Sequence, residues 1–290
     1  MSSFQGTKIN PSRFDKSQLK FYLFLIPLSI LMLLPILFIF NQAFKPQSEL
    51  FEYPPKFFVR KPTMGNFSEF FRVMNATSVP LSRYIANTLF VTIIGVFLSI
   101  VFSALSAYGL SKLKFKGKKL LFEINTIALM FVPIAVQIPR YLIIARMGLI
   151  DNYLVHILPM IVLPVAMFLL KQFIDQVPND LIESAKIDGA SEMEIFIKVI
   201  LPIISPAIAT VGILSFQQIW NDVVSSTLYI NDESKRTLAF FIQSLTSTHN
   251  TVAGQGMAAA ASLIMFLPNF ILFVILQSKV MNTMAHSGIK

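Results

Sequence analysis

The sequence predicts an all-α integral membrane protein with six transmembrane helices, and three observations lead to this fold class. Hydrophobic residues make up 54% of the 290 residues and charged residues only 13%, about half the charged share of an ordinary soluble domain. Several uncharged stretches are long enough to cross a bilayer. Lysines gather in one link between two such stretches, as they do on the cytoplasmic side of membrane proteins. Part of the solvent of this chain is therefore lipid.

The first span is predicted by Phe21–Phe40, a run without a single charge that matches the length a helix needs to cross hydrocarbon. The basic segment before it resembles the start of a signal peptide. The run is longer than the apolar region of a signal peptide, however, and no small-residue cleavage site follows it. We therefore expect a cytoplasmic segment over residues 1–20, a first transmembrane helix over 21–43 and an extracytoplasmic loop over 44–84.

Five further spans are expected in a core domain over residues 85–281. A short cytoplasmic tail over residues 282–290 is expected to follow it. The ranges of the five spans are Ile85–Leu110, Leu120–Ile144, Tyr153–Leu170, Leu201–Ile230 and Gly256–Val280. Proline removes a helical hydrogen bond and bends a helix. The two proline pairs Pro133/Pro139 and Pro159/Pro164 therefore predict bends in the third and fourth spans.

Positive charge sets the orientation. The link Ser111–Lys119 holds five lysines in nine residues, and the N-terminal segment holds four Lys or Arg. Six spans place both segments on one side, which the positive-inside rule makes cytoplasmic. The outer loop carries six Lys or Arg and departs from this rule. The net charge of +9 is explained by membrane orientation, and no nucleic-acid partner is expected.

Catalytic chemistry finds no support in the sequence. The chain has no cysteine and three scattered histidines, so disulfides and thiolate chemistry are excluded and a structural metal site is disfavoured. It contains no G-x-x-x-x-G-K-[ST] for ATP binding, no H-E-x-x-H and no G-x-S-x-G. Acidic residues and histidines form no spaced intramembrane series of the kind that relays protons. We expect no catalytic residue, no metal ligand and no cofactor in this chain.

The link between spans four and five predicts a helix–turn–helix outside the bilayer. Asp180 and Glu183 have the spacing of a capping box, and Ser191 and Glu194 repeat it. Gly189 between them supplies a left-handed residue that ends the first helix. The polar face of that helix is mainly acidic, whereas helices that lie on lipid favour Lys and Arg. Docking into a protein partner is therefore the favoured role, and covering the helix bundle is the alternative.

This link carries a resemblance to a known family. Glu183-Ser184-Ala185-(x)3-Gly189-(x)11-Leu201-Pro202 resembles the "EAA" loop, here over residues 177–202, of ATP-binding-cassette (ABC) importer permeases. The carbohydrate-uptake branch, typified by maltose permeases, is similar at further segments: Asn87-Thr88-Leu89, Ala107-Tyr108-Gly109, Phe115-Lys116-Gly117-Lys118-Lys119, Leu149-Ile150-Asp151-Asn152, Ile187-Asp188-Gly189-Ala190, Phe196, Pro206, Trp220-Asn221-Asp222 and Arg236-Thr237-Leu238. Ser184 departs from the family, which usually has alanine there.

The resemblance implies the type I ABC importer permease fold, with a cytoplasmic coupling-helix loop that docks into a separate ATPase. The coupling residues it implies are Glu183, Ser184, Ala185, Asp188, Gly189 and Ala190. The implied partners are a second homologous permease, two copies of an ABC ATPase that hold the ATP and magnesium, and an extracytoplasmic solute-binding protein. The implied substrate is a carbohydrate, in particular an oligosaccharide. The implied location is the bacterial cytoplasmic (inner) membrane, with multiple spans and both termini in the cytoplasm.

A substrate path is expected near the outer end of the fifth span. Trp220 offers a face for stacking on a sugar ring, and polar side chains nearby can accept hydroxyl hydrogen bonds. The candidates are Gln217, Trp220, Asn221, Asp222 and Asn87. An interfacial aromatic anchor is the alternative for Trp220, and an interhelical hydrogen bond is the alternative for Asn87. For the whole chain, the alternatives are an ion-coupled secondary transporter or channel and, more remotely, an integral membrane enzyme.

Overall fold

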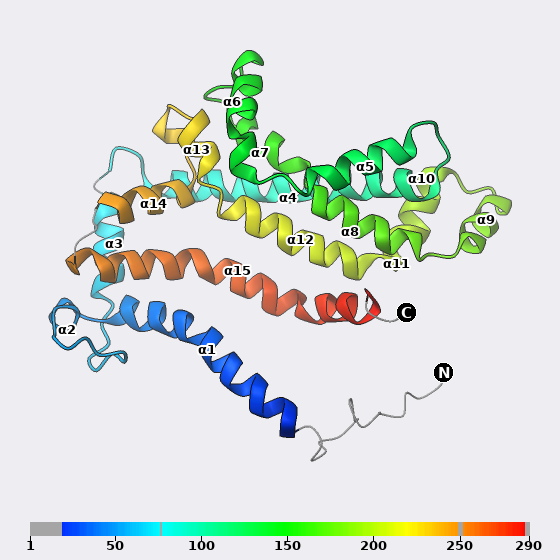
Figure 1. Ribbon diagram of the computed structural model, residues 1–290. Helices are drawn as coiled ribbons and strands as arrows, with labels where there is room; N and C mark the ends of the chain where they lie inside the picture. Colours follow the sequence, from blue (N-terminus) through cyan, green and yellow to red (C-terminus); the bar gives the residue numbers. More distant parts are fainter. Residues whose placement is uncertain (1–18, 76, 249–251, 288–290) are drawn as a thin grey trace. The chain divides into compact units, whose positions relative to one another are not determined.

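The computed structural model describes residues 19–75, 77–248 and 252–287 (Figure 1). Across these residues every regular element is helical, which confirms the predicted fold class. The elements of the first part are α1 (Leu19–Phe44), α2 (Gln47–Leu50), α3 (Gly65–Asn75), α4 (Leu81–Lys112), α5 (Lys118–Ala128), η2 (Pro133–Val136), α6 (Gln137–Arg146), α7 (Leu154–Ile161) and α8 (Pro164–Asp175). The elements that follow are α9 (Asn179–Ile187), α10 (Glu192–Ile195), η3 (Phe196–Ile200), α11 (Leu201–Ile203), α12 (Ser205–Trp220), α13 (Val224–Tyr229), η4 (Glu233–Lys235), α14 (Leu238–Thr248) and α15 (Val252–Ser287).

The described residues contain three helices that are long and apolar enough to cross a membrane: α1, α4 and the Gly254–Ser278 part of α15. Three bent helix pairs pass the same test when each pair counts as one span. These pairs are α5 with η2–α6, α7 with α8, and the α10–α11 stretch with α12. Together they give up to six spans, in agreement with the predicted number.

The bends follow the prolines. Pro133 begins η2 at a break of 111°, and Pro164 begins α8 at a break of 41°, so the bends predicted in spans three and four are confirmed. The predicted fifth span, Leu201–Ile230, is not one helix, because α12 meets the preceding helix at 82° and ends at Trp220. Pro206 lies in the first turn of α12, where its ring is incompatible with an unbroken helix running in from the preceding residues.

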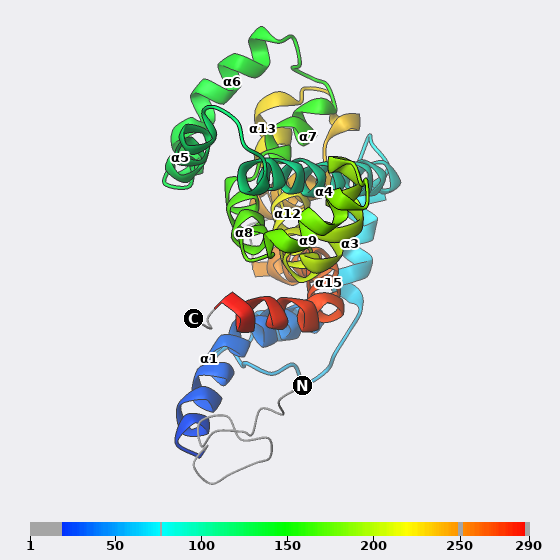
Figure 2. The same cartoon turned by 90° about the vertical axis from the view of Figure 1, so that its right-hand side faces the viewer.

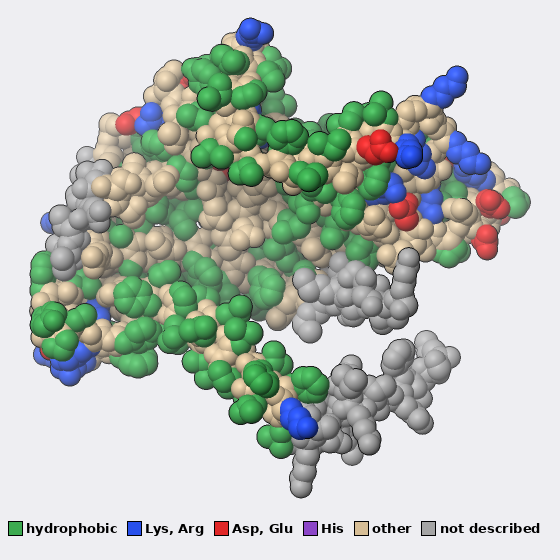
Figure 3. Space-filling model, in the orientation of Figure 1, with side chains coloured by type: hydrophobic (Ala, Val, Ile, Leu, Met, Phe, Trp, Pro, Cys, Tyr) green, Lys and Arg blue, Asp and Glu red, His purple; other side chains and the backbone are tan. Residues whose placement is uncertain are grey.

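The chain divides into two compact units, of which the first comprises Met1–Arg72 and Thr248–Leu263. Within it, the buried Asn66 side chain donates to the carbonyl oxygens of Ala43 and Lys45 at 2.9 and 2.8 Å. A Cβ at position 256 would lie 2.5 Å from Asn66 Oδ1, so Gly256 is required for this close approach. Hydrophobic side chains cover the exposed surface of α1 (Figure 3), as expected for a helix that faces lipid.

The second unit comprises Val73–Ser247 and Ile264–Lys290, and its core forms where α4 packs against α7, α8 and α12. Figures 1 and 2 show α4 running alongside α8 and α12. Small residues such as Ala104, Ala107 and Ala207 are fully buried in this core and let the helix backbones approach closely. Ser99 and Ser215 hydrogen-bond across α4 and α12 at 3.1 Å. This packing fixes both ends of α4, where the candidate functional residues lie.

Candidate functional site

The segment predicted to couple to an ATPase folds as a short helix, a glycine turn and a second helix. Gly189 has φ of +82°, which confirms the predicted left-handed residue. Its N–H donates to Lys186 O at 3.0 Å, and the next N–H, of Ala190, donates to Ala185 O at 2.9 Å. These two bonds form a complete Schellman motif at the end of α9. Only glycine, or to a lesser degree asparagine, adopts this backbone conformation at low energy.

One of the two predicted capping boxes is present. Ser191 Oγ accepts from the Glu194 N–H at 3.3 Å while Glu194 Oε2 accepts from the Ser191 N–H at 3.0 Å, which confirms the second box. The first is wrong, because the N-cap of α9 is Pro178, which forms no side-chain cap. Asp180 lies inside the first turn of α9 as a result, where its charge favours the positive end of the helix dipole.

The C-terminal end of α4 holds this segment in place. Tyr108 Oη donates to Glu192 Oε2 at 2.7 Å, and Glu192 also pairs with Lys186 of α9 at 2.6 Å. One turn along α4, Lys112 Nζ donates to Val177 O at 2.6 Å and to Asn179 Oδ1 at 3.0 Å. Short polar contacts therefore tie α9 and α10 to α4.

The predicted coupling residues divide into an exposed set and a partly buried set. Glu183, Ser184, Asp188 and Gly189 are exposed. Ala185 and Ala190 pack against the core cluster with the buried Ile182. The exposed set shares the surface with Ile187, whose exposed fraction is 87%. The segment thus presents an acidic surface with an exposed apolar side chain, backed by a buried apolar face.

A cavity of about 1250 Å³ lies at the C-terminal end of α12. Its polar lining includes Gln137, Arg140, Gln218, Asn221, Asp222 and Gln243, and its apolar lining includes Phe131, Met160 and Phe240. Two of the predicted path residues, Asn221 and Asp222, thus line it. Gln243 was missed by the sequence analysis, although a lone glutamine in the apolar α14 was a visible signal. The cavity combines apolar walls with several amide groups and two charged side chains, which suits a polar ligand.

The other predicted path residues lie elsewhere within the described residues. Trp220 is 7% exposed, stacks on Phe216 with ring centroids 5.4 Å apart and donates from Nε1 to Met265 O at 3.1 Å. Gln217 is exposed beside Asn221, whose Nδ2 donates to Gln217 O at 2.8 Å. In this structure Trp220 therefore packs helices together, and neither residue is among those that line the cavity.

Asn87 belongs to a polar network near the N-terminal end of α4. Its Nδ2 donates to the carbonyl oxygens of Ser234 and Arg236 at 2.8 and 2.9 Å, and its Oδ1 accepts from Tyr153 Oη at 3.0 Å. The next residue, Thr88, accepts at Oγ1 from the Leu238 N–H at 2.8 Å. Asn87 thus forms the interhelical hydrogen bonds that the sequence allowed as an alternative.

Asp151 also bonds to the segment 231–238, to which Asn87 and Thr88 bond. It has φ of +64°, and its Oδ1 accepts from the N–H groups of Asn231 and Asp232 at 3.2 and 3.0 Å. Its Oδ2 pairs with Lys235 at 2.9 Å. The backbone N–H of Asp232 and then Lys235 lower the pKa of Asp151, and Asp151 raises the pKa of Lys235. Both groups are therefore charged at neutral pH. Two segments distant in sequence, at Asn87–Thr88 and at Asp151, thus converge on residues 231–238.

Comparisons with known proteins agree with this arrangement. The family model described as "Binding-protein-dependent transport system inner membrane component" matches residues 99–278. Protein LplC of Bacillus subtilis (strain 168) is 32% identical over 234 residues, which cover 81% of this chain and 77% of that protein. The arabinooligosaccharides transport system permease protein AraQ of the same organism is 29% identical over 279 residues, covering 96% of this chain and 98% of AraQ.

A solved structure shares the fold. It is the crystal structure of a bacterial ABC transporter involved in the import of the acidic polysaccharide alginate, with a TM-score of 0.77 and 21% identity. The match covers 92% of this chain and 98% of the matched chain. The helical arrangement described above is therefore the fold of the matched chain of that transporter.

Proposed function

Because this chain belongs to the family of binding-protein-dependent transport system inner membrane components, we propose that it forms one half of the membrane pathway of an ATP-driven carbohydrate importer. It is a multi-pass membrane protein, and its place is the bacterial cytoplasmic membrane with both termini in the cytoplasm. Family membership favours this function over the ion-coupled transporter or channel that the composition alone allows. The chain itself catalyses no reaction in this proposal.

The single observation that carries the ATP-driven mechanism is the segment α9–Gly189–α10. It is exposed on one side, carries Glu183 and Asp188 beside Ile187, and is tied to α4 through Tyr108 and Lys112. The arrangement supports docking into an ATPase groove, with α4 receiving the motion.

The partners follow from the same proposal. A second homologous permease completes the pathway, two copies of an ABC ATPase bind ATP and magnesium, and an extracytoplasmic solute-binding protein delivers the substrate. The family description names binding-protein-dependent transport, which supports the last of these partners. No nucleic acid takes part.

The substrate is a carbohydrate, in particular an oligosaccharide. Support comes from the transport of arabinooligosaccharides named for AraQ and from the amide-rich cavity at the outer end of α12. Asn221 and Asp222 are the best-placed path residues, because they line that cavity. Gln217, Trp220 and Asn87 lie outside the lining of that cavity. In this proposal Trp220 and Asn87 hold α12 and the N-terminal end of α4 in place.

The proposed function is tested with the purified importer complex reconstituted in vesicles. Binding protein loaded with oligosaccharide should stimulate ATP hydrolysis, and uptake should require ATP on the cytoplasmic side. Uptake that proceeds in the absence of ATP, driven by a sodium or proton gradient alone, would refute the proposal.

The cavity gives a prediction about transport. Asn221→Ala removes a polar group from the cavity and should raise the KM for uptake about tenfold, since a lost hydrogen bond costs roughly 1–3 kcal/mol. Gln217→Ala, on the same helix but outside the cavity, should have a smaller effect. Initial uptake rates over a range of substrate concentrations provide the measurement. Normal uptake by both variants would place the substrate contacts in the partner permease.

The orientation gives a further prediction. The chain has no cysteine, so a single introduced cysteine reports its own side of the membrane. Ser48→Cys, at an exposed position of α2, should react with an impermeant thiol reagent in intact cells, whereas Lys116→Cys should react only after permeabilisation. The reverse pattern would invert the proposed topology.

A further inference from the structure

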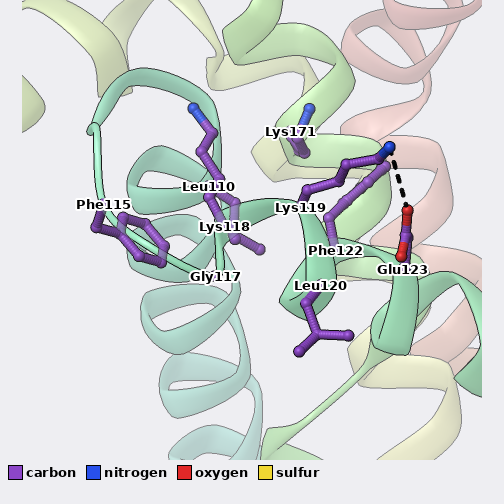
Figure 4. Close-up of a pocket in the computed structure, with 9 residues that line it drawn as sticks. All are labelled: Leu110, Phe115, Gly117, Lys118, Lys119, Leu120, Phe122, Glu123 and Lys171. Carbon is purple, nitrogen blue, oxygen red and sulfur yellow. Dashed lines mark ion pairs between the residues drawn. The ribbon is translucent and has the colours of Figure 1, made fainter.

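The link between α4 and α5 borders a cavity of about 720 Å³ that the proposed transport function does not use (Figure 4). Lys118, Lys119 and Lys171 line it together with apolar side chains that include Leu120 and Phe122. The cavity lies where the apolar part of α4 ends and that of α5 begins. In a membrane protein this position is the boundary between hydrocarbon and water.

The positive charge of this cavity is only partly neutralised. Lys118 Nζ donates to the carbonyl oxygens of Ser111 and Leu113 at 2.7 and 3.1 Å, and these uncharged acceptors leave its charge in place. Lys119 is 92% exposed and lies 3.8 Å from the carboxylate of Glu123 (Figure 4). At this exposure and distance, the carboxylate of Glu123 neutralises little of the charge of Lys119.

Lys171 and the neighbouring sequence also contribute to the charge at the mouth of this cavity. Lys171 pairs closely with Asp175 at 2.6 Å and lies 4.5 Å from the centroid of the Phe122 ring. Lys114 and Lys116 are exposed in the adjoining link, and the sequence from Leu113 to Phe122 contains no acidic residue. The cavity mouth therefore carries a net positive charge and attracts an anion.

The apolar side of the cavity continues away from the lysines. A second cavity, of about 520 Å³, shares Lys119, Phe122 and Glu123 with the first and extends to Ile127 and Met130. The exposed fractions of Ile127 and Met130 are 55% and 81%. From residue 119 to residue 130 the chain advances roughly 16 Å at helical rise, about half the thickness of the hydrocarbon core. The two cavities together form a basic mouth followed by an apolar groove one leaflet deep.

We propose that this pair of cavities binds an anionic phospholipid. Its phosphate lies at Lys118 and Lys119, and an acyl chain follows α5 toward Ile127 and Met130. A free phosphate would use the basic mouth and leave the groove empty, whereas a neutral lipid would use the groove without the lysines. Basic pockets between transmembrane helices on the cytoplasmic side recognise lipid head groups by this combination of charge and apolar surface.

The experiment uses the whole importer complex in phosphatidylcholine vesicles. A fluorophore is attached to Ile124→Cys, an exposed position on α5 outside both cavities, and the complex without this cysteine gives the background. At a small, equal mole fraction, brominated phosphatidylglycerol should quench the label more strongly than brominated phosphatidylcholine. We expect about a fivefold difference in apparent affinity, the factor that one lysine near an anionic surface supplies.

Matched variants separate the site from general surface charge. Lys118→Gln/Lys119→Gln should abolish the preference for phosphatidylglycerol, whereas Lys114→Gln/Lys116→Gln removes the same charge outside the cavity and should preserve it. An equal loss in both double variants would overturn the proposal in favour of diffuse attraction. Absence of any preference in the unsubstituted chain would overturn it too. The measurement is repeated in inorganic phosphate and in chloride at the same ionic strength. Loss of the preference in phosphate alone would also overturn the proposal, because the site would then accept a soluble anion.

Discussion

Gly189→Val is expected to abolish transport while the protein still inserts in the membrane at normal abundance. No atom lies within 4 Å of a Cβ built at this position, so the substitution causes no clash. The cost is conformational, because φ of +82° penalises a side chain with a Cβ by roughly 1–2 kcal/mol, and a β-branched residue suffers most. Relief of this strain rotates α9 away from its Schellman geometry and redirects Glu183 and Asp188.

The measurement combines uptake, membrane abundance and retention of the ATPase during purification. Gly189→Asn is the matched control, since asparagine tolerates the left-handed region and the surrounding space is open. It should keep most of the transport that Gly189→Val loses. If Gly189→Val transported normally and retained the ATPase, the segment would be a structural brace, and the proposed coupling role would be refuted.

Asn87→Leu is expected to destabilise the protein strongly. The Asn87 side chain is 4% exposed and makes three hydrogen bonds, to Ser234, Arg236 and Tyr153. Leucine has a similar volume but pairs with none of them, and each buried polar group left unpaired costs roughly 1–3 kcal/mol. Thermal unfolding of the purified complex should shift down by several degrees, with loss of transport at physiological temperature.

A positioning role and a substrate role for Asn87 differ in their kinetics. Tyr153→Phe removes one of the three bonds to Asn87, together with the bond that Tyr153 Oη accepts from Arg83 Nη2 at 3.2 Å. It should cause a smaller loss of thermal stability than Asn87→Leu, with the KM for uptake unchanged. An Asn87→Leu protein with normal thermal stability and a raised KM would instead show that Asn87 contacts the substrate.

Local patterns explain what could be predicted from the sequence. The run Phe21–Phe40 and the lysines of Ser111–Lys119 report on the bilayer directly, because hydrocarbon length and positive charge act on each segment separately. The caps at Gly189 and Ser191 depend on bonds that span fewer than six residues. The capping box predicted at Asp180 is equally local but is absent, because Pro178 is the N-cap and the helix begins earlier than the spacing suggests.

By itself, then, the sequence determined the membrane environment, the number of spans and the turn of the coupling segment. Only the tertiary structure decided which polar residues share a site. Asn87, Asp151 and Lys235 meet around one turn, and Asn221 faces a cavity with Gln243 while its neighbour Trp220 is buried against Phe216. These outcomes depend on the 111° and 82° bends and on helix packing between residues up to 150 positions apart. A proline marks where a helix can bend. The packing of the neighbouring helices sets the direction of the bend.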